Sequence, residues 1–212
     1  MAVSSKIAGL SGASMGAAGL GGYAVYSHVK SENPKEETSY RTKLSHALLS
    51  LSGSSHQSNW EKRLSSLKTA DESSLVEELK ALKTKQSPSA ATWTDVQTWC
   101  NNNIDGKFTN EEELKFVNLR TYCVFSISEK IPSVIATGTE HSDAKWTGAL
   151  SKFKTYSGKL SSEFETLKSN SASTNDAQQL KTTCEKYYDK PFLSEEDEEF
   201  KSVKGVCVDQ QN

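Results

Sequence analysis

The chain has 212 residues, with 27 acidic and 25 basic side chains and a formal net charge of −2. This length allows one or two domains with a substantial hydrophobic core. The two signs of charge are interspersed, so no strongly basic face is expected, and this argues against nucleic-acid binding. Hydrophobic residues make up only 35% of the chain and there are four prolines, a composition that suits helices in a largely water-exposed body.

The first predicted element is an uncharged segment at residues 7–26, with the sequence IAGLSGASMGAAGLGGYAVY. As a helix it would be about 30 Å long, which matches the hydrocarbon core of a bilayer. Small residues recur every four positions, as in Ala8, Gly12 and Gly16, and this favours close helix packing in a membrane. We therefore predict an apolar N-terminal helix that anchors the chain in a membrane within residues 1–28, followed by a polar linker at residues 29–38.

Two other interpretations of this segment stay open. A secretory signal peptide cut near Ala24 would have a similar composition, and so would a Gly-rich tail without fixed structure. A signal anchor close to the N-terminus usually leaves the remainder of the chain outside the cell. We therefore expect a cell-membrane protein whose bulk is extracellular, with secretion as the alternative.

Beyond the linker the apolar residues have helical spacing, and no segment alternates with the period of a strand. Residues 40–51 carry one amphipathic face, and we expect them to form the first helix, with its apolar positions at Tyr40, Leu44, Ala47, Leu48 and Leu51. Ser74 and Glu77 have the spacing of a capping box that would begin a later helix. Pro132 falls inside another expected helix, which it would either begin or kink.

The chain also resembles itself. Placing Cys184 on Cys100 makes eight of 25 positions identical without a gap, namely two Cys, one Asp, two Phe, two Glu and one Val. Weaker matches extend upstream, for example between the segments that begin at Trp60 and Trp146. The predicted fold is therefore all-α, with two tandem, pseudo-repeated small helical bundles at residues 39–126 and 127–212.

The segment NNNIDGKFTNEE at residues 101–112 has the spacing of an EF-hand calcium loop. Its candidate ligands are Asn101, Asn103, Asp105 and Glu112. The matching segment in the second half lacks both a ligand at the third position and a glycine at the sixth. A structural hairpin between two helices therefore accounts for this segment better, and calcium binding is kept as the alternative.

Cysteine spacing gives the most specific prediction. The four cysteines form two pairs with the same separation of 23 residues, Cys100 with Cys123 and Cys184 with Cys207. None has CxxC spacing, which argues against zinc. We predict one disulfide within each half, since an outward-facing chain would lie in an oxidising compartment; four reduced, buried cysteines are the other interpretation.

No catalytic motif of the HExxH, GxSxG, Walker A or GxGxxG type occurs, so we predict neither an enzyme nor a cofactor. The Gly/Ala-rich start and the segment WTDVQTWC resemble large families of uncharacterised paralogous proteins in haemotropic mycoplasmas. The resemblance implies a membrane-associated or surface-exposed protein and no particular activity. We expect a non-catalytic, surface-exposed interaction protein that is membrane-bound through residues 7–26 and has an unidentified protein partner on a host or neighbouring surface. The alternative is a secreted module that binds a ligand or calcium.

Overall fold

Helices dominate the structure, a computed structural model that describes residues 38–170 and 176–209. In these two ranges there are nine α-helices, two short 3₁₀ helices and no β-strand, so the predicted all-α class is confirmed for them. The apolar segment at residues 7–26 lies outside the described residues. Among the helices that are described, none has the length and apolar character needed to cross a membrane.

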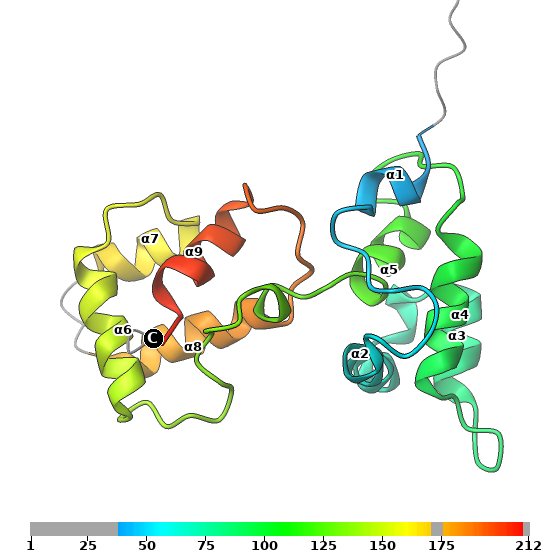
Figure 1. The fold of residues 1–212 in the computed structure, drawn as a ribbon, viewed down its shortest axis with the longest axis horizontal. Helices are drawn as coiled ribbons and strands as arrows, with labels where there is room; N and C mark the ends of the chain where they lie inside the picture. The colour runs from blue at the N-terminus through cyan, green and yellow to red at the C-terminus, as the bar shows by residue number, and fades with distance from the viewer. Residues whose placement is uncertain (1–37, 171–175, 210–212) are drawn as a thin grey trace, which may run out of the picture. The chain divides into compact units, whose positions relative to one another are not determined.

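The first half of the chain is built around one central helix, α4 (Trp93–Asn103), which packs against α2 (Gln57–Thr69), α3 (Glu77–Thr84) and α5 (Leu114–Tyr122). A short helix α1 (Tyr40–Leu44) lies on α5, and the 3₁₀ helix η1 (Glu72–Ser74) leads into α3 (Figure 1). The apolar stripes of these helices meet in a common core, whose fully buried members include Trp60, Leu67, Leu79, Val96 and Leu119.

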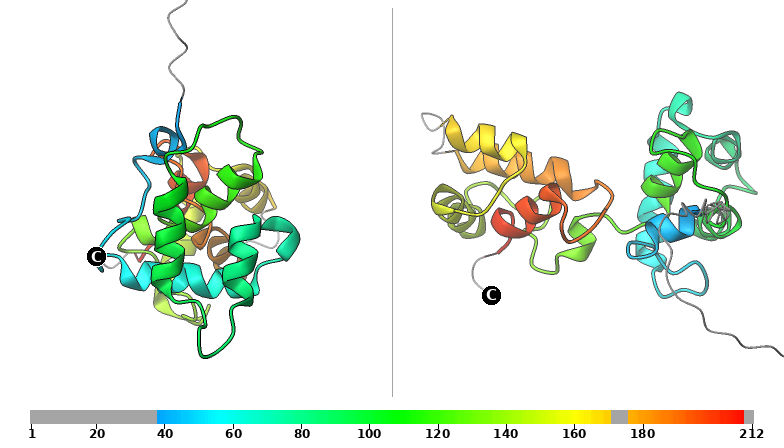
Figure 2. Two further views of the ribbon diagram at one scale, coloured as in Figure 1. Left: turned by 90° about the vertical axis from the view of Figure 1, so that its right-hand side faces the viewer. Right: turned by 90° about the horizontal axis from the view of Figure 1, so that it is seen from above.

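The second half uses the same kind of arrangement around α8 (Ala177–Tyr188). This helix packs against α6 (Ala144–Thr155), α7 (Ser162–Ser169) and α9 (Glu198–Val206), and also against the 3₁₀ helix η2 (Ser128–Lys130). Figure 2 shows α7, α8 and α9 grouped together in the view from above. The core of the second half contains the buried residues Trp146, Phe153, Phe164, Leu180 and Val203.

Acidic side chains begin several of these helices. The carboxylates of Asp143, Asp176 and Asp197 accept hydrogen bonds from backbone N–H groups in the first turns of α6, α8 and α9, at 2.8, 3.0 and 3.0 Å. At the start of α4 the N–H of Thr92 donates to Asp95 at 2.8 Å. These bonds satisfy donors that a helix start otherwise leaves unpaired, and they place negative charge at the positive end of the helix dipole.

Three local predictions are wrong. The first helix ends at Leu44 instead of reaching residue 51, because the following segment becomes extended and the N–H of Leu49 donates to the carbonyl of Cys123 at 2.9 Å. The capping box at Ser74 and Glu77 is absent: Ser74 ends η1, which Asp71 caps, and α3 is preceded by Val76. Pro132 lies in a turn that follows η2, so no helix begins or bends there.

Four backbone hydrogen bonds of the first half have counterparts in the second. Each bond joins a backbone group in residues 38–49 to one in residues 106–125. In the second half, the counterpart of the first group lies 86 or 87 positions later in the chain, and the counterpart of the second group lies 84 positions later. The paired bonds are Tyr40 N to Gly106 O and Ile127 N to Lys190 O; Phe108 N to Thr38 O and Phe192 N to Phe125 O; Leu49 N to Cys123 O and Ile135 N to Cys207 O; and Phe125 N to Ala47 O and Asp209 N to Ser133 O. Phe125 takes part in both halves, because its N–H donates to Ala47 in the first half and its carbonyl accepts from Phe192 in the second.

Candidate functional site

All four cysteines form disulfides, with the pairing predicted from their spacing. The Sγ atoms of Cys100 and Cys123 are 2.04 Å apart, and those of Cys184 and Cys207 are 2.03 Å apart. Each bond joins the central helix of its half, α4 or α8, to the end of the last helix, α5 or α9. All four residues are fully buried, so the bonds are part of the two cores.

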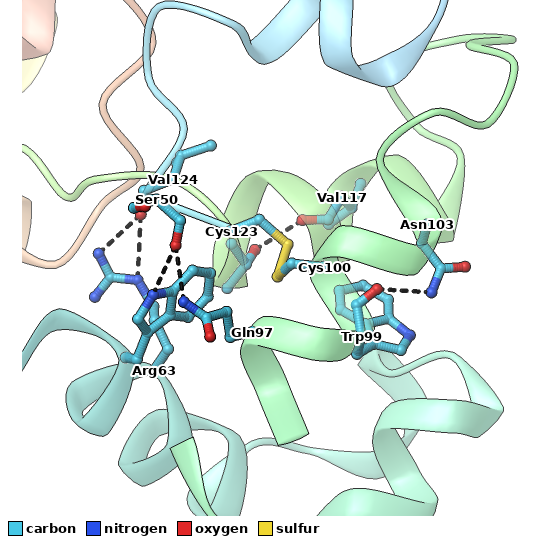
Figure 3. The surroundings of a disulfide bond; sticks show 11 residues. Ser50, Arg63, Gln97, Trp99, Cys100, Asn103, Val117, Cys123 and Val124 are labelled. Atoms are coloured by element: carbon cyan, nitrogen blue, oxygen red, sulfur yellow. Dashed lines mark hydrogen bonds between the residues drawn. A yellow bond between two sulfur atoms is a disulfide. The ribbon is translucent and has the colours of Figure 1, made fainter. Parts of the chain in front are cut away.

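Side chains near the first disulfide hold the extended segments that follow α1 and α5 (Figure 3). The backbone carbonyl of Ser50 accepts hydrogen bonds from Trp60 Nε1 at 3.2 Å and from Gln97 Nε2 at 3.0 Å. Arg63 Nη2 donates to the carbonyl of Val124 at 2.9 Å. Residues of α2 and α4 therefore fix backbone groups that no helix could satisfy.

The candidate calcium ligands have other positions and partners. Asn101 and Asn103 lie in the last turn of α4, and the side-chain amide of Asn103 donates to the carbonyl of Trp99 at 2.9 Å. Both carboxylate oxygens of Asp105 accept hydrogen bonds from Arg41, at 2.6 and 3.0 Å, and this guanidinium lowers the pKa of Asp105. Glu112 is exposed. Across the described residues no group of three or more His, Cys, Asp or Glu side chains could hold a metal ion.

The segment instead has the features of a hairpin between helices. A Cβ on Gly106 would lie 2.8 Å from Cε2 of Tyr40, so the glycine allows the turn to lie against that ring. The ring of Phe108 packs on that of Phe116 at 4.9 Å between centroids, and the ring of Phe192 packs on that of Phe200 at 4.8 Å.

A groove of about 300 Å³ lies between α3 and α4, on the first half of the chain. Its lining includes Glu78, Leu82, Asp95, Thr98, Trp99 and Asn102. Trp99 is only 6% exposed, and its indole Nε1 has no hydrogen-bond partner among the described residues. In Figure 3 this indole extends away from the Cys100–Cys123 bond. A buried donor without an acceptor is uncommon in folded proteins, but this Nε1 atom is itself buried and is not open to a ligand in the groove.

The two carboxylates of the groove differ in how firmly they are held. Asp95 accepts hydrogen bonds from the N–H of Thr92 and from Lys85 Nζ, the latter at 2.9 Å, and together these lower its pKa to about 2. Glu78 has only a loose ion pair, in which its carboxylate lies 3.8 Å from Lys115 Nζ and its side chain is 55% exposed. Glu78 is therefore the less firmly held of the two carboxylates.

In the second half, the helix pair α7 and α8 contains its own cation. Lys186 of α8 places its Nζ 2.9 and 2.8 Å from the two carboxylate oxygens of Glu163 in α7, and the hydroxyl of Tyr187 donates to Glu163 at 3.0 Å. Lys186 is the largest cause of the lowered pKa of Glu163. Aligning the two halves on their cysteines places Asn102 opposite Lys186, a difference that the sequence contains and that motif searching does not reveal.

No family model matches the chain, and no curated protein or solved structure is significantly similar to it. Its function has to be inferred from its own residues and their arrangement.

Proposed function

We propose that this chain is a non-catalytic interaction protein that works outside the cytoplasmic membrane, tethered by residues 7–26. The observation that carries the proposal is the pair of disulfides, one in each half, at matched positions. Stable disulfides are typical of proteins in oxidising compartments and rare in the cytosol. The partner is proposed to be a protein on a host or neighbouring surface.

The two halves, residues 39–126 and 127–212, are proposed to be copies of one disulfide-closed unit. The four paired backbone hydrogen bonds support this view, and so do the side chains of two matched lysines. Lys83 Nζ donates to the carbonyl of Ala70, at the end of α2, and Lys168 Nζ donates to the carbonyl of Tyr156, at the end of α6. Two related units in tandem suit a protein that acts by contact, because each unit offers its own surface.

The location can be tested on intact cells that produce the full-length chain. We expect an added protease to cleave the chain, and the chain to enter the detergent phase on phase separation, whereas a variant without residues 7–26 should remain in the aqueous phase. Mass spectrometry without reduction should recover the linked peptides of Cys100–Cys123 and Cys184–Cys207 and should report the mature N-terminus.

The possible outcomes separate the alternatives. A chain that lacks its first residues and is recovered from the medium would indicate secretion. A chain that is shielded from protease until the cells are broken, with four reduced cysteines, would refute the proposal.

A further inference from the structure

A second groove, the α1–α5 groove, has a volume of about 170 Å³ and is lined by both halves of the chain. The first half contributes α1, α5 and the hairpin before α5, and the second half contributes Leu193, from the segment after α8. Nε2 of His46 donates to the carbonyl of Leu193, and this bond joins the two sides. The lining includes Lys43, His46, Glu111, Phe116, Arg120 and Leu193.

Basic groups outnumber carboxylates in this lining. The Nζ of Lys43 lies 4.6 Å from the centroid of the Phe108 ring and forms no ion pair with a carboxylate of the described residues. Arg120 donates to Glu111 through Nη1 alone, at 3.3 Å, and a guanidinium carries several further N–H donors. The groove therefore offers an ammonium group without a carboxylate, and additional guanidinium donors, to an incoming anion.

Leu193 gives the same groove an apolar wall. It is 40% exposed, and among the described residues the only other large hydrophobic side chain exposed to this degree is Leu114, at 41%. Covering such a side chain removes apolar surface from water, which is favourable. A ligand that fits the α1–α5 groove therefore combines a negative charge with an apolar group.

This combination decides between two classes of anionic ligand. A sulfated sugar brings negative charge but little apolar surface to cover a leucine. A peptide presents a carboxylate and an apolar side chain on neighbouring residues. The volume of about 170 Å³ is below the range for whole small-molecule ligands and suits individual side chains.

We infer that the α1–α5 groove binds an acidic peptide segment of the partner, in which a glutamate or aspartate lies next to an apolar residue. The carboxylate pairs with Lys43 and Arg120, and the apolar side chain packs on Leu193. The inference rests on the proposed function as an interaction protein and adds to it the chemistry of the recognised segment.

The test is a titration of the full-length chain, ¹³C-labelled at its leucine methyl groups, with the peptide acetyl-Gly-Glu-Leu-Gly-amide. NMR would follow the Leu193 signals, which the Leu193→Ser variant identifies by their absence. A saturable shift is expected, with a Kd on the order of millimolar for so short a peptide. The same peptide with glutamine in place of glutamate should bind about tenfold more weakly, because it lacks the charge.

Matched variants test the role of the two cations. Lys43→Gln and Arg120→Gln should each weaken binding about tenfold. Lys204→Gln is the control: the guanidinium of Arg120 and the ammonium of Lys204 each lie 5.6 Å from the ring centroid of a phenylalanine, but Lys204 does not line the groove. The control should bind like the parent chain, which separates recognition of the peptide from a merely structural contact with a ring.

The apolar wall has a matched pair of its own. Leu193→Ser should weaken binding, as measured at the other leucine methyl signals that shift, whereas Leu114→Ser should leave it unchanged, since the two leucines are equally exposed and only Leu193 lines the groove. All five variants change exposed or half-buried side chains, and each should keep the dispersed spectrum of the parent chain.

The inference is overturned if the Leu193 signals do not shift in a saturable way, if the glutamine peptide binds equally well, or if Lys43→Gln and Arg120→Gln bind like the parent chain. A sulfated disaccharide that binds more tightly than the peptide would also overturn it, because the groove would then recognise the anion alone. None of these results bears on cell location, so a failed titration with a protease-accessible chain leaves the proposed function standing. Saturable, charge-dependent binding by a chain that proves cytosolic would support the groove and refute the location.

Discussion

The guanidinium of Arg63 in α2 pairs with the carboxylate of Glu129 in η2, and these side chains are only 9% and 5% exposed. Arg63 also donates to the carbonyl of Val124, and the N–H of Ser126 donates to Glu129 at 2.8 Å. Burial alone would raise the pKa of Glu129, but Arg63 and this N–H outweigh it, and the net shift is downward. A buried, hydrogen-bonded ion pair thus fixes the chain where the first half passes into the second.

Replacing Arg63 should destabilise the protein strongly, because Glu129 would remain buried without its cation. We expect Arg63→Met to lower the free energy of unfolding in urea by about 3–5 kcal/mol. Lys62→Met is the matched control, since Lys62 Nζ lies 3.7 Å from the same carboxylate but its side chain is 65% exposed. The control should cost less than about 1 kcal/mol. Similar losses in both variants would show that the buried pair has no special weight.

Asp95 predicts a specific loss of stability in acid. Its pKa is lowered to about 2 by the N–H of Thr92 and by Lys85. A carboxylate whose pKa falls on folding stabilises the protein fully above its unfolded pKa near 4, and the effect disappears as pH falls through 2. Asp95→Asn should therefore be less stable by about 1 kcal/mol at pH 6, a modest figure because the side chain is partly exposed.

The measurement is urea unfolding of the parent chain and of Asp95→Asn between pH 6 and pH 2. The two stability curves should converge between pH 4 and pH 2. Curves that stay parallel down to pH 2 would contradict the assignment of the low pKa to this carboxylate.

Each disulfide should stabilise the protein independently of the other. A bond between cysteines 23 positions apart closes a loop whose chain entropy is worth about 3.4 kcal/mol. We expect the double variant Cys100→Ala with Cys123→Ala to lose about this much, and the variant of the second pair to lose a similar amount. Unfolding followed separately by near-ultraviolet circular dichroism and by fluorescence would measure both, and an oxidised chain no more stable than a reduced one would contradict the prediction.

Asn118 should be the most sensitive buried amide in the first half. It is 2% exposed, its Oδ1 accepts from the N–H of Val76, and its Nδ2 donates to the carbonyl of Ser74, both at 2.8 Å. Asn118→Ala would leave both backbone groups without a partner at the start of α3, at a cost of about 1–3 kcal/mol. The exposed Asn101→Ala is the control and should change the thermal midpoint little; equal midpoints for the two variants would refute the prediction.

Patterns that are local in sequence predicted the structure best. The apolar residues beyond the linker have helical spacing, and the structure buries three of them, Trp60, Leu67 and Val96, in helices of the first half. The cysteine spacing was informative because a disulfide needs only that its two partners lie close. The predictions were wrong where a residue distant in sequence decides the conformation. The apolar spacing of residues 40–51 suits a helix, but the N–H of Leu49 donates a hydrogen bond to the carbonyl of Cys123 instead.

The candidate groove could not have been found from motifs. Glu78 and Asn102 belong to no sequence motif, and both are exposed in the structure. They are notable only because they line the open space between two packed helices. A signal did exist in the internal alignment, where Asn102 stands opposite Lys186. The unpaired indole of Trp99 had no such signal, since a tryptophan on an apolar stripe is expected to lie in the core whether or not its N–H finds an acceptor.

The disulfides also limit how far the molecule can be stretched. A chain pulled from its two ends would unravel its helices, but the segment inside each closed loop cannot lengthen, because the load passes through the sulfur atoms. With Cα atoms 5.7 and 5.8 Å apart across bonds that span 23 positions, each loop withholds about 75 Å of contour length. Under shear the two halves would extend by only part of their contour length. The hairpins after α4 and α8 would stay intact until the bonds were reduced.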